Sequence, residues 1–327
     1  MAHTLEASSN AGGANHWVRA LGRRLIEIPP AYFVLAAVLI AIALLNPNLM
    51  KPQVLLTFIR QSAPLGVAVL GQLMVMRARS IDLSIGGVFI ITNYLLTSGL
   101  LGGQPVAVLV LAPLVVGLVV GLVNGALIAL VRASAVIVTL GVSIILTGIV
   151  LFMSSGRPPG RVPDELRAIA NARIDVVPVP VIIWVVAAVI VAVLLKTLIF
   201  GRYLTAIGSN PQAARFSGLP LPRIVVTTHV LSGLLAALGG VMFTAALGVG
   251  SVKFGPEIMM NSIAATILGG VTFGSGRGGV AGPFVGVVAF ALLFALMTVF
   301  GIQEPGKLIV QGTVIAVAAI IYGMRTR

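Results

Sequence analysis

The 327-residue sequence contains no cysteine, which excludes disulfides, thiolate metal sites and thiol nucleophiles. Charged residues are also scarce, because Asp, Glu, Lys and Arg together make up 9% of the chain, whereas 58% is hydrophobic. A soluble domain carries about 25% charged residues, since its surface must be hydrated. So few charges leave no adequate polar surface, and the composition therefore predicts an integral membrane protein with a lipid-covered exterior.

Acidic residues are especially few, with 8 Asp and Glu against 21 Lys and Arg. A basic excess is also typical of nucleic-acid-binding proteins, which carry it on one face or along one helix. Here the basic residues lie in short groups between apolar stretches, the pattern that the positive-inside rule predicts for a multi-pass membrane protein. We therefore expect a lipid bilayer around the chain and no nucleic acid as a partner.

Ten apolar stretches approach the length of about 20 residues that a spanning helix needs. They are 31–46, 53–75, 81–98, 106–130, 135–153, 178–199, 223–247, 258–273, 280–299 and 307–323. Two of them, 81–98 and 258–273, are short and interrupted by glycine. The sequence predicts an all-α integral membrane protein with about ten transmembrane helices, some of them glycine-broken, in a single domain over 29–327.

Glycines recur at four-residue spacing in two stretches, at Gly117, Gly121 and Gly125 and again at Gly282 and Gly286. Each set follows a short glycine-broken stretch, which indicates a weak internal repeat. Small residues at this spacing let helix backbones approach closely, and glycine-broken segments at matching places in two halves mark translocation sites. Generic helix packing explains the same glycines equally well, so both interpretations stay open.

Residues 1–28 are polar and basic, and no apolar region with a cleavage site follows them. They are interpreted as a cytoplasmic tail and not as a signal peptide. With both termini in the cytoplasm, the inner loops carry most of the Lys and Arg residues. This orientation places the long polar connection 154–177 outside, as a periplasmic loop.

A second polar connection, 201–222, falls on the cytoplasmic side and has the signals of a short helix. Asn210 is a favourable N-cap, Pro211 suits the first helical position, and Gly218 is typical of the end. So short a helix has no core of its own, and its apolar residues must pack against a partner or the membrane surface. An ordinary interfacial helix remains open on this pattern alone.

Two segments fit nucleotide-binding motifs but lack their context. Gly301–Lys307 fits the beginning of a P-loop, yet Leu308 stands where a metal-binding Ser or Thr is needed. Gly274–Gly279 fits G-x-G-x-x-G but joins two apolar stretches, where a tight turn is the better explanation. No Ser/His/Asp set or metal-ligand spacing emerges, and His229 is interpreted as a helix-packing residue. We therefore expect no enzyme, metal or cofactor in this chain, and any ATP hydrolysis belongs to another polypeptide.

Asp82 places a carboxylate at the start of an apolar stretch. A charge costs at least about 2.5–3.5 kcal/mol at the bilayer centre and much less at an end. There Asp82 or Ser84 is expected to accept from exposed backbone N–H groups of the following helix, with Arg77 and Arg79 near enough in sequence to be partners. Two interpretations stay open, an N-cap at the membrane interface and a determinant of a broken helix beside a pathway.

Four segments together carry a resemblance to a known family. Ile81–Gly86 reads IDLSIG, Ala135–Gly148 reads AVIVTLGVSIILTG, Gly201–Gly218 reads GRYLTAIGSNPQAARFSG, and Ala264–Gly270 reads AATILGG, with Gly276-Arg277-Gly278 after it. In order and spacing they resemble the ribose/xylose/arabinose-type permeases of bacterial ATP-binding-cassette (ABC) sugar importers, in the branched-chain amino acid and monosaccharide permease superfamily. The resemblance covers nearly everything after the tail. One departure is Arg79-Ser80, where the family usually has Gly-Gly.

The resemblance implies the permease subunit of an importer in the bacterial inner membrane. In that family two permease chains, identical or different, form the pathway, and a periplasmic binding protein delivers the sugar. A cytoplasmic ATPase, which binds ATP and Mg²⁺, drives alternating access. The 202–218 loop would correspond to the coupling helix seated in the ATPase. The residues expected to serve this coupling are Arg202, Asn210, Ala214, Arg215 and Gly218.

Neutral sugars need hydroxyl and amide groups more than charges, and transient binding serves transport better than tight binding. The candidates for the pathway or for helix breaks are Asp82, Ser84, Gly86, Asn93, Asn124, Thr139, Ser143, Asn261, Thr266, Gly269 and Gly270. Polar side chains also hydrogen-bond between membrane helices, at about 0.6 kcal/mol each. At most half of the polar candidates are therefore expected to face the pathway.

Two other classes of transporter stay open. A branched-chain amino acid permease of the same superfamily is the closest alternative, and the I-D-L-S-x-G element argues against it. A proton- or sodium-coupled carrier would work without an ATPase. It would be expected to need an intramembrane acid or ion site, for which Asp82 near the end of a span is the main material.

Overall fold

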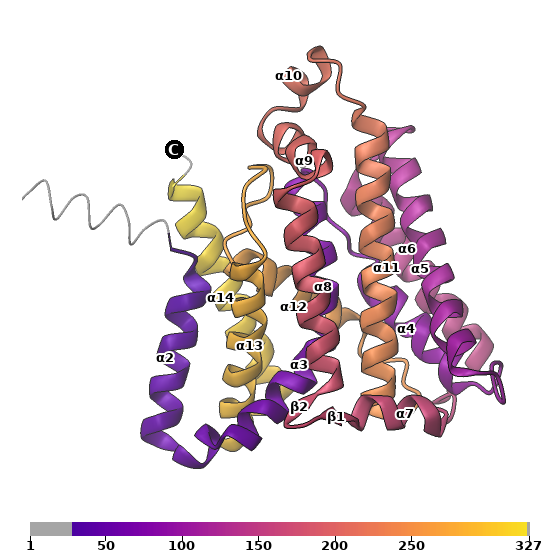
Figure 1. Ribbon diagram of the computed structural model, residues 1–327, viewed down its shortest axis with the longest axis vertical. Coiled ribbons are helices and arrows are strands. Elements are labelled where there is room, and N and C mark those ends of the chain that lie inside the picture. Colours follow the sequence, from indigo (N-terminus) through magenta and orange to yellow (C-terminus); the bar gives the residue numbers. More distant parts are fainter. Residues whose placement is uncertain (1–27, 326–327) are drawn as a thin grey trace, which may run out of the picture.

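The computed structural model describes residues 28–325, which form one bundle of helices (Figure 1). The predicted tail 1–28 therefore lies outside the described residues except for its last position. The elements are α2 (Pro30–Leu45), η1 (Pro47–Met50), α3 (Pro52–Arg77), α4 (Ile85–Thr97), α5 (Val106–Ala129), α6 (Ala135–Ser154), α7 (Asp164–Asn171), β1 (Arg173–Ile174), β2 (Val177–Pro178), α8 (Val179–Lys196), α9 (Ile199–Ser209), α10 (Pro211–Phe216), α11 (Leu221–Leu247), α12 (Gly255–Leu268), α13 (Ala281–Val299) and α14 (Glu304–Arg325).

Each of the ten predicted stretches coincides with one helix, so the prediction of an all-α membrane protein is confirmed. Among the described residues, six helices are long and apolar enough to cross a membrane, namely α3, α5, α6, α8, α11 and α13. Helices α4 and α12 have 13 and 14 residues. At 1.5 Å per residue they measure about 20 Å, well short of a hydrocarbon core of about 30 Å.

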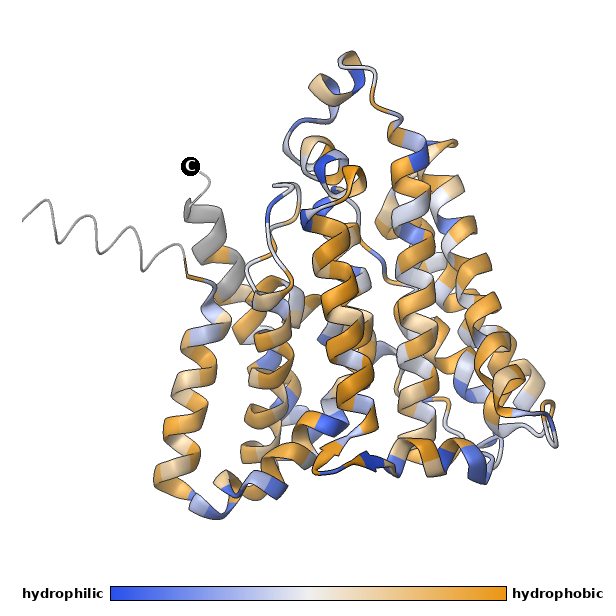
Figure 2. Cartoon of the chain, in the orientation of Figure 1, coloured by the Kyte–Doolittle hydropathy of each residue, from blue (hydrophilic) through white to orange (hydrophobic). Residues whose placement is uncertain are grey.

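Helix α3 lies at the centre of the bundle. Its second half, from Ser62 to Arg77, is buried except for Leu65, which is half-buried. It packs against α8, α11, α12 and α13. Helices α5 and α6 instead expose branched apolar side chains such as Val119 and Ile144. Figure 2 shows hydrophobic residues along most of the helix lengths and hydrophilic residues gathered near the two ends, as a bilayer requires.

The glycines of α5 let this helix pack backbone to backbone against α11. A side chain at Gly121 would overlap the carbonyl of His229 on α11, and one at Gly117 would overlap the carbonyl of Gly233. In the same way, a side chain at Gly286 on α13 would lie 2.5 Å from the carbonyl of Ala265. Both sets of glycines thus permit close backbone packing, as their spacing predicts. The internal repeat stays a prediction.

The two ends of the bundle differ in what they carry (Figure 1). The α10 end comprises α9, α10, the irregular segment 78–84 and the loop 269–280. The α7 end comprises α7, β1 and β2, joined to residues 248–250 by a bridge between Arg161 and Val249. The two predicted polar connections therefore lie at opposite ends. Each is more structured than a loop, since 154–177 contains α7 and 201–222 contains most of α9 as well as α10.

Candidate functional site

A break in the helical path separates α3 from α4. Residues 80–83 have no regular structure, so the predicted span 81–98 becomes helical only at Ile85. Arg79 has a φ of +58°, a left-handed conformation that turns the chain after α3. The break is deeply buried, and Asp82 is only 1% exposed.

The carboxylate of Asp82 is held by three neutral donors. Its Oδ1 accepts from the backbone N–H of Ser84 at 2.9 Å and from the Ser84 hydroxyl at 2.5 Å, and its Oδ2 accepts from the Ser232 hydroxyl at 2.7 Å. Asp82 thus accepts from the backbone N–H of Ser84, which precedes α4, and no side chain of the described residues caps the N–H groups inside the helix. Its link to Ser232 also joins the break to α11, which supports the role in a broken helix.

The pairing of Asp82 with Arg77 or Arg79 is wrong. Arg77 donates to the Gly278 carbonyl at 3.1 Å and to the Thr205 hydroxyl at 2.7 Å. Arg79 donates to the carbonyl of Gly208 at 2.8 Å. Both guanidinium groups bind neutral partners on α9 and the 269–280 loop, because the left-handed turn at Arg79 separates them from the carboxylate.

Two further predicted residues fix the same break. Asn124 on α5 donates to the Ser84 hydroxyl at 2.9 Å, and the Thr139 hydroxyl on α6 accepts from the Leu83 backbone N–H at 3.0 Å. His229 on α11 lies 2.8 Å from the hydroxyl of Ser80 through its Nε2. Asp82, Asn124, Thr139 and His229 therefore tie the break to three surrounding helices, and His229 packs there as predicted.

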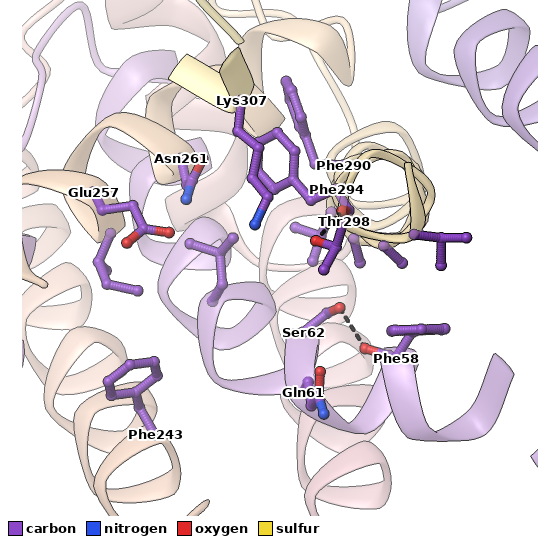
Figure 3. Close-up of a pocket in the computed structure, with 16 residues that line it drawn as sticks. Phe58, Gln61, Ser62, Phe243, Glu257, Asn261, Phe290, Phe294, Thr298 and Lys307 are labelled. Atoms are coloured by element: carbon purple, nitrogen blue, oxygen red, sulfur yellow. Dashed lines mark hydrogen bonds between the residues drawn. The ribbon is translucent and has the colours of Figure 1, made fainter. Parts of the chain in front are cut away.

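A cavity of about 450 Å³ opens between α3, α11, α12, α13 and α14 (Figure 3). Helix α3 ends at the α10 end and α13 begins there. The cavity is lined by Phe58, near the start of α3, and by Thr298, near the end of α13. Both places are nearer the α7 end than the α10 end. The lining residues are Phe58, Gln61, Ser62, Leu65, Phe243, Glu257, Ile258, Asn261, Val287, Phe290, Ala291, Phe294, Ala295, Thr298, Val299 and Lys307.

The cavity combines aromatic side chains with amide, hydroxyl and charged groups. Asn261 is 5% exposed, and its Oδ1 has no hydrogen-bond partner among the described residues. Lys307 is paired with Glu304 at 2.6 Å, whereas Glu257 forms no ion pair in the described part of the chain. Figure 3 shows Asn261 and Lys307 on one side of the cavity and Ser62 and Gln61 on the other. Such a lining offers hydrogen bonds and apolar faces to a polar, uncharged ligand.

The other pathway candidates lie elsewhere. Ser143 and Gly86 line a second, mainly apolar cavity of about 310 Å³ between α4, α6 and α12. Asn93 is engaged by α11 and the following loop, since its Oδ1 accepts from the Ser251 backbone N–H at 2.8 Å. The Thr266 hydroxyl binds within its own helix, to the carbonyl of Ser262 at 2.6 Å.

Gly269 and Gly270 end α12 and open the loop to α13. A side chain at Gly269 would overlap the backbone of Pro283, and Gly270 has a φ of +88°. Both positions therefore require glycine, which marks a helix break and not a ligand contact. The predicted span 258–273 is accordingly a helix that ends at Leu268.

The 201–222 segment contains the predicted short helix. The side chain of Asn210 accepts from the backbone N–H groups of Gln212 and Ala213 at 3.1 and 3.0 Å, which confirms the N-cap. Gly218, the second residue after the helix, has a φ of +75°, which confirms the predicted end. Ala214 is buried, but the neighbouring Phe216 is 90% exposed. Arg202 and Arg215 make no side-chain hydrogen bond or ion pair within residues 28–325.

Sequence reasoning missed several residues of the larger cavity. Gln61 and Ser62 fall inside the predicted span 53–75, and Glu257 and Lys307 lie at the ends of the predicted spans 258–273 and 307–323. A signal existed, because Gln61 and Ser62 interrupt a span that is otherwise apolar around them. An amide and a hydroxyl side by side in such a span indicate a polar surface inside the bundle.

Comparison with known proteins identifies the relatives. Residues 54–319 match the family described as "Branched-chain amino acid transport system / permease component". The ribose import permease protein RbsC of Bacillus subtilis is 30% identical over 86% of this chain and 88% of its own length. RbsC of Escherichia coli K12 is 29% identical over 88% and 92% of the two chains, and the autoinducer 2 import system permease protein LsrC of Klebsiella pneumoniae is 29% identical over 90% and 85%. No solved structure matches.

These matches cover nearly all of the described bundle, including the break at Asp82, the α9–α10 segment and the 450 Å³ cavity. They confirm the resemblance that the sequence motifs carry. The protein is a multi-pass inner-membrane permease subunit and not an enzyme, and it belongs to the branched-chain amino acid transport system permease family.

Proposed function

We propose that this chain is the membrane-spanning subunit of an ATP-driven importer that carries a monosaccharide. The observation that supports it most is the match to permease proteins named for ribose import over 86% of this chain and 88% of the Bacillus subtilis relative. The family description mentions branched-chain amino acids, so the relatives, and not the family, favour a sugar.

The 450 Å³ cavity is the proposed sugar site. Four phenylalanines supply apolar faces, and Gln61, Ser62, Asn261 and Thr298 supply amide and hydroxyl groups. Of the predicted pathway residues, Asn261 contacts the sugar, and Ser143 with Gly86 lies beside the second cavity. Asp82, Ser84, Asn124 and Thr139 hold the helix break. The sugar is bound loosely here, as a transport cycle requires.

All ten helices matched by predicted spans are proposed to enter the membrane, with both termini and the α10 end in the cytoplasm. The distribution of cations supports this orientation. Arg77 and Arg79 bind elements of the α10 end, and Arg132 and Arg215 line one cavity of about 300 Å³ there. The sugar cavity then lies nearer the periplasmic side, where a binding protein would deliver its ligand.

The cytoplasmic α9–α10 segment is proposed to receive the ATPase. Arg202, Arg215 and the exposed Phe216 offer contacts, whereas Asn210, Ala214 and Gly218 set the shape of the helix. The complete importer adds an ATPase that binds ATP and Mg²⁺, a periplasmic sugar-binding protein and a second permease chain, identical or homologous. Closure of the ATPase moves α10, and the helices alternate between inward-open and outward-open states.

Co-purification with the ATPase encoded beside this chain tests the proposal, followed by ATP hydrolysis in liposomes with the sugar and its binding protein. We expect a stable complex whose hydrolysis is stimulated by a pentose or hexose. Stimulation by leucine or valine instead would replace the sugar with a branched-chain amino acid. Transport without any ATPase would favour an ion-coupled carrier and contradict the importer.

A further inference from the structure

Arg79 occupies the junction between α9 and α10. Its Nε donates to the carbonyl of Gly208 at 2.8 Å, and its Nη2 donates to the carbonyl of Ser209 at 3.3 Å. These carbonyls belong to the last turn of α9, where no intrahelical partner is available. A cation at a helix C-terminus is also favoured by the helix dipole. Arg79 therefore caps α9 from a different part of the chain.

The same guanidinium group reaches a third element. Its Nε also donates to the carbonyl of Gly274 at 3.1 Å, in the loop 269–280 between α12 and α13. Arg77 makes the same kind of link, because it binds both Thr205, about one turn earlier on α9, and Gly278 in the loop. Each of the two arginines thus joins α9 to that loop from the end of α3.

At two glycines of this junction, backbone contacts leave no room for a side chain. A side chain at Gly208 would overlap the carbonyl of Arg77 and the backbone of Gly276. A side chain at Gly276 would lie 2.5 Å from the carbonyl of Thr205. Because α9, the end of α3 and the loop pack backbone to backbone, a displacement of one is transmitted to the others and is not absorbed by soft side chains.

The loop leads directly to the proposed sugar cavity. It begins at the C-terminus of α12, where the backbone N–H of Val271 donates to the carbonyl of Thr266 at 3.2 Å. Helix α12 carries Glu257 and Asn261, which line the cavity. A continuous path of contacts therefore runs from α10 through Arg79 and the loop to α12.

We propose that Arg79 is a positioning residue that links the α9–α10 junction to the loop 269–280, and so couples movement of α10 to α12 and the sugar cavity. The inference rests on the proposed function, because α10 moves only if an ATPase binds it. A Gly-Gly pair at positions 79 and 80 would have no side chain at this junction. In this chain, the guanidinium group of Arg79 joins the end of α3 to α9 and to the loop 269–280.

The test compares Arg79→Gly, Arg79→Lys and Arg277→Ala in the full complex. Arg79→Gly removes the guanidinium without straining the backbone, because a φ of +58° is one that glycine adopts freely. Arg277 is an exposed arginine of the same loop whose side chain makes no hydrogen bond within the described residues, so its replacement removes the same charge without touching the link. The readouts are binding of the ATPase, basal hydrolysis, and sugar transported per ATP hydrolysed.

We expect Arg79→Gly to bind the ATPase and hydrolyse ATP at the basal rate, but to transport about fivefold less sugar per ATP, the lower end of typical coupling between sites. Arg79→Lys falls between Arg79→Gly and the wild type, and Arg277→Ala matches the wild type. A wild-type ratio in Arg79→Gly overturns the link alone. A wild-type chain that shows no sugar-stimulated hydrolysis contradicts the proposed function itself.

A distance measurement provides a second test that needs no transport. The chain has no cysteine, so spin labels attach only at Gln212→Cys and Gly279→Cys. Gln212 is exposed, and nothing lies within 4 Å of a side chain built at Gly279. We expect one narrow distance distribution between these labels, which broadens in Arg79→Gly. A distribution that stays narrow without the guanidinium overturns the link.

Discussion

The α10 end and the 450 Å³ cavity are built on opposite principles. At the α10 end, glycines bring three backbones together, and two arginines satisfy the carbonyls that remain. Around the cavity, side chains from five helices leave an open space, and the amide oxygen of Asn261 has no partner among the described residues. The α10 end has no room for a side chain at Gly208 or Gly276, whereas the cavity keeps an open space.

This difference fits a transporter in which the ATPase acts on the α10 end and the sugar binds in the cavity. Dense backbone packing transmits displacement, because interiors packed to crystal-like density resist compression. A site for a transient ligand needs room and unsatisfied polar groups instead. The Asp82 cluster belongs to the α10 end and ties the break at residues 80–83 to α5, α6 and α11.

The largest effect is expected from a bulky side chain in the tightly packed junction at the α10 end. Gly208→Val places a side chain against the carbonyl of Arg77 and the backbone of Gly276, so we expect transport to be lost. Uptake in proteoliposomes measures it. Gly141→Val on α6 is the matched control, because nothing lies within 4 Å of a side chain there. Normal uptake by Gly208→Val would show that the α10 end has room to relax.

The second-largest effect is expected from removing the Asp82 carboxylate. Asp82→Ala leaves the Ser84 backbone N–H and two hydroxyls without their acceptor, at a cost of about 3 kcal/mol. We expect the apparent melting temperature in detergent to fall by about 5 °C or more. Asp82→Asn, which keeps one acceptor oxygen, should lose less. Equal melting of all three proteins would mean that the cluster does not hold the break.

A smaller effect is expected at the surface where α10 is proposed to bind the ATPase. Phe216→Ala should weaken binding of the ATPase about thirtyfold, as the loss of a buried aromatic contact of about 2 kcal/mol does. Phe152→Ala on α6 is a control of similar exposure, with 87% against 90%. Binding to the purified ATPase by surface plasmon resonance separates them. Equal affinities would exclude Phe216 from the interface.

The smallest effect is expected from a substitution in the 450 Å³ cavity. Asn261→Ala should raise the half-saturating sugar concentration about tenfold, equivalent to about 1.4 kcal/mol, while binding of the ATPase stays unchanged. Gln104→Ala removes an exposed amide outside the cavity and should match the wild type. An unchanged sugar dependence in Asn261→Ala would place the sugar elsewhere.

The sequence predicts the helices well because hydropathy depends on neighbouring residues. All ten stretches appear, and the N-cap at Asn210 and the end at Gly218 follow from local chemistry. The prediction places most of α9 in the polar connection 201–222, because this segment is not hydrophobic enough to span a membrane. Thr205 and Gly208 face the end of α3 and the 269–280 loop, whereas Gly201 packs against the backbone of Leu195 at the end of α8.

The cavity and the arginine link depend on distant residues. Cavity residues come from segments around 58–65, 243, 257–261, 287–299 and 307, and no local pattern brings these together. Arg79 is three residues from Asp82, so a pair was expected from proximity. The left-handed backbone at Arg79 sends its side chain to α9, and Asp82 turns to Ser232 on α11.

The most direct measurement is uptake of a labelled pentose or hexose into proteoliposomes that hold this chain with its ATPase, supplied with the cognate binding protein. The account predicts accumulation against a gradient that requires ATP and binding protein, with Asn261→Ala shifting the sugar dependence and Gly208→Val abolishing uptake. Two results would contradict this account: uptake that persists without ATP, or uptake that is the same in both variants as in the wild type. Either would exclude an importer in which the ATPase acts on the α10 end and the sugar binds in the cavity.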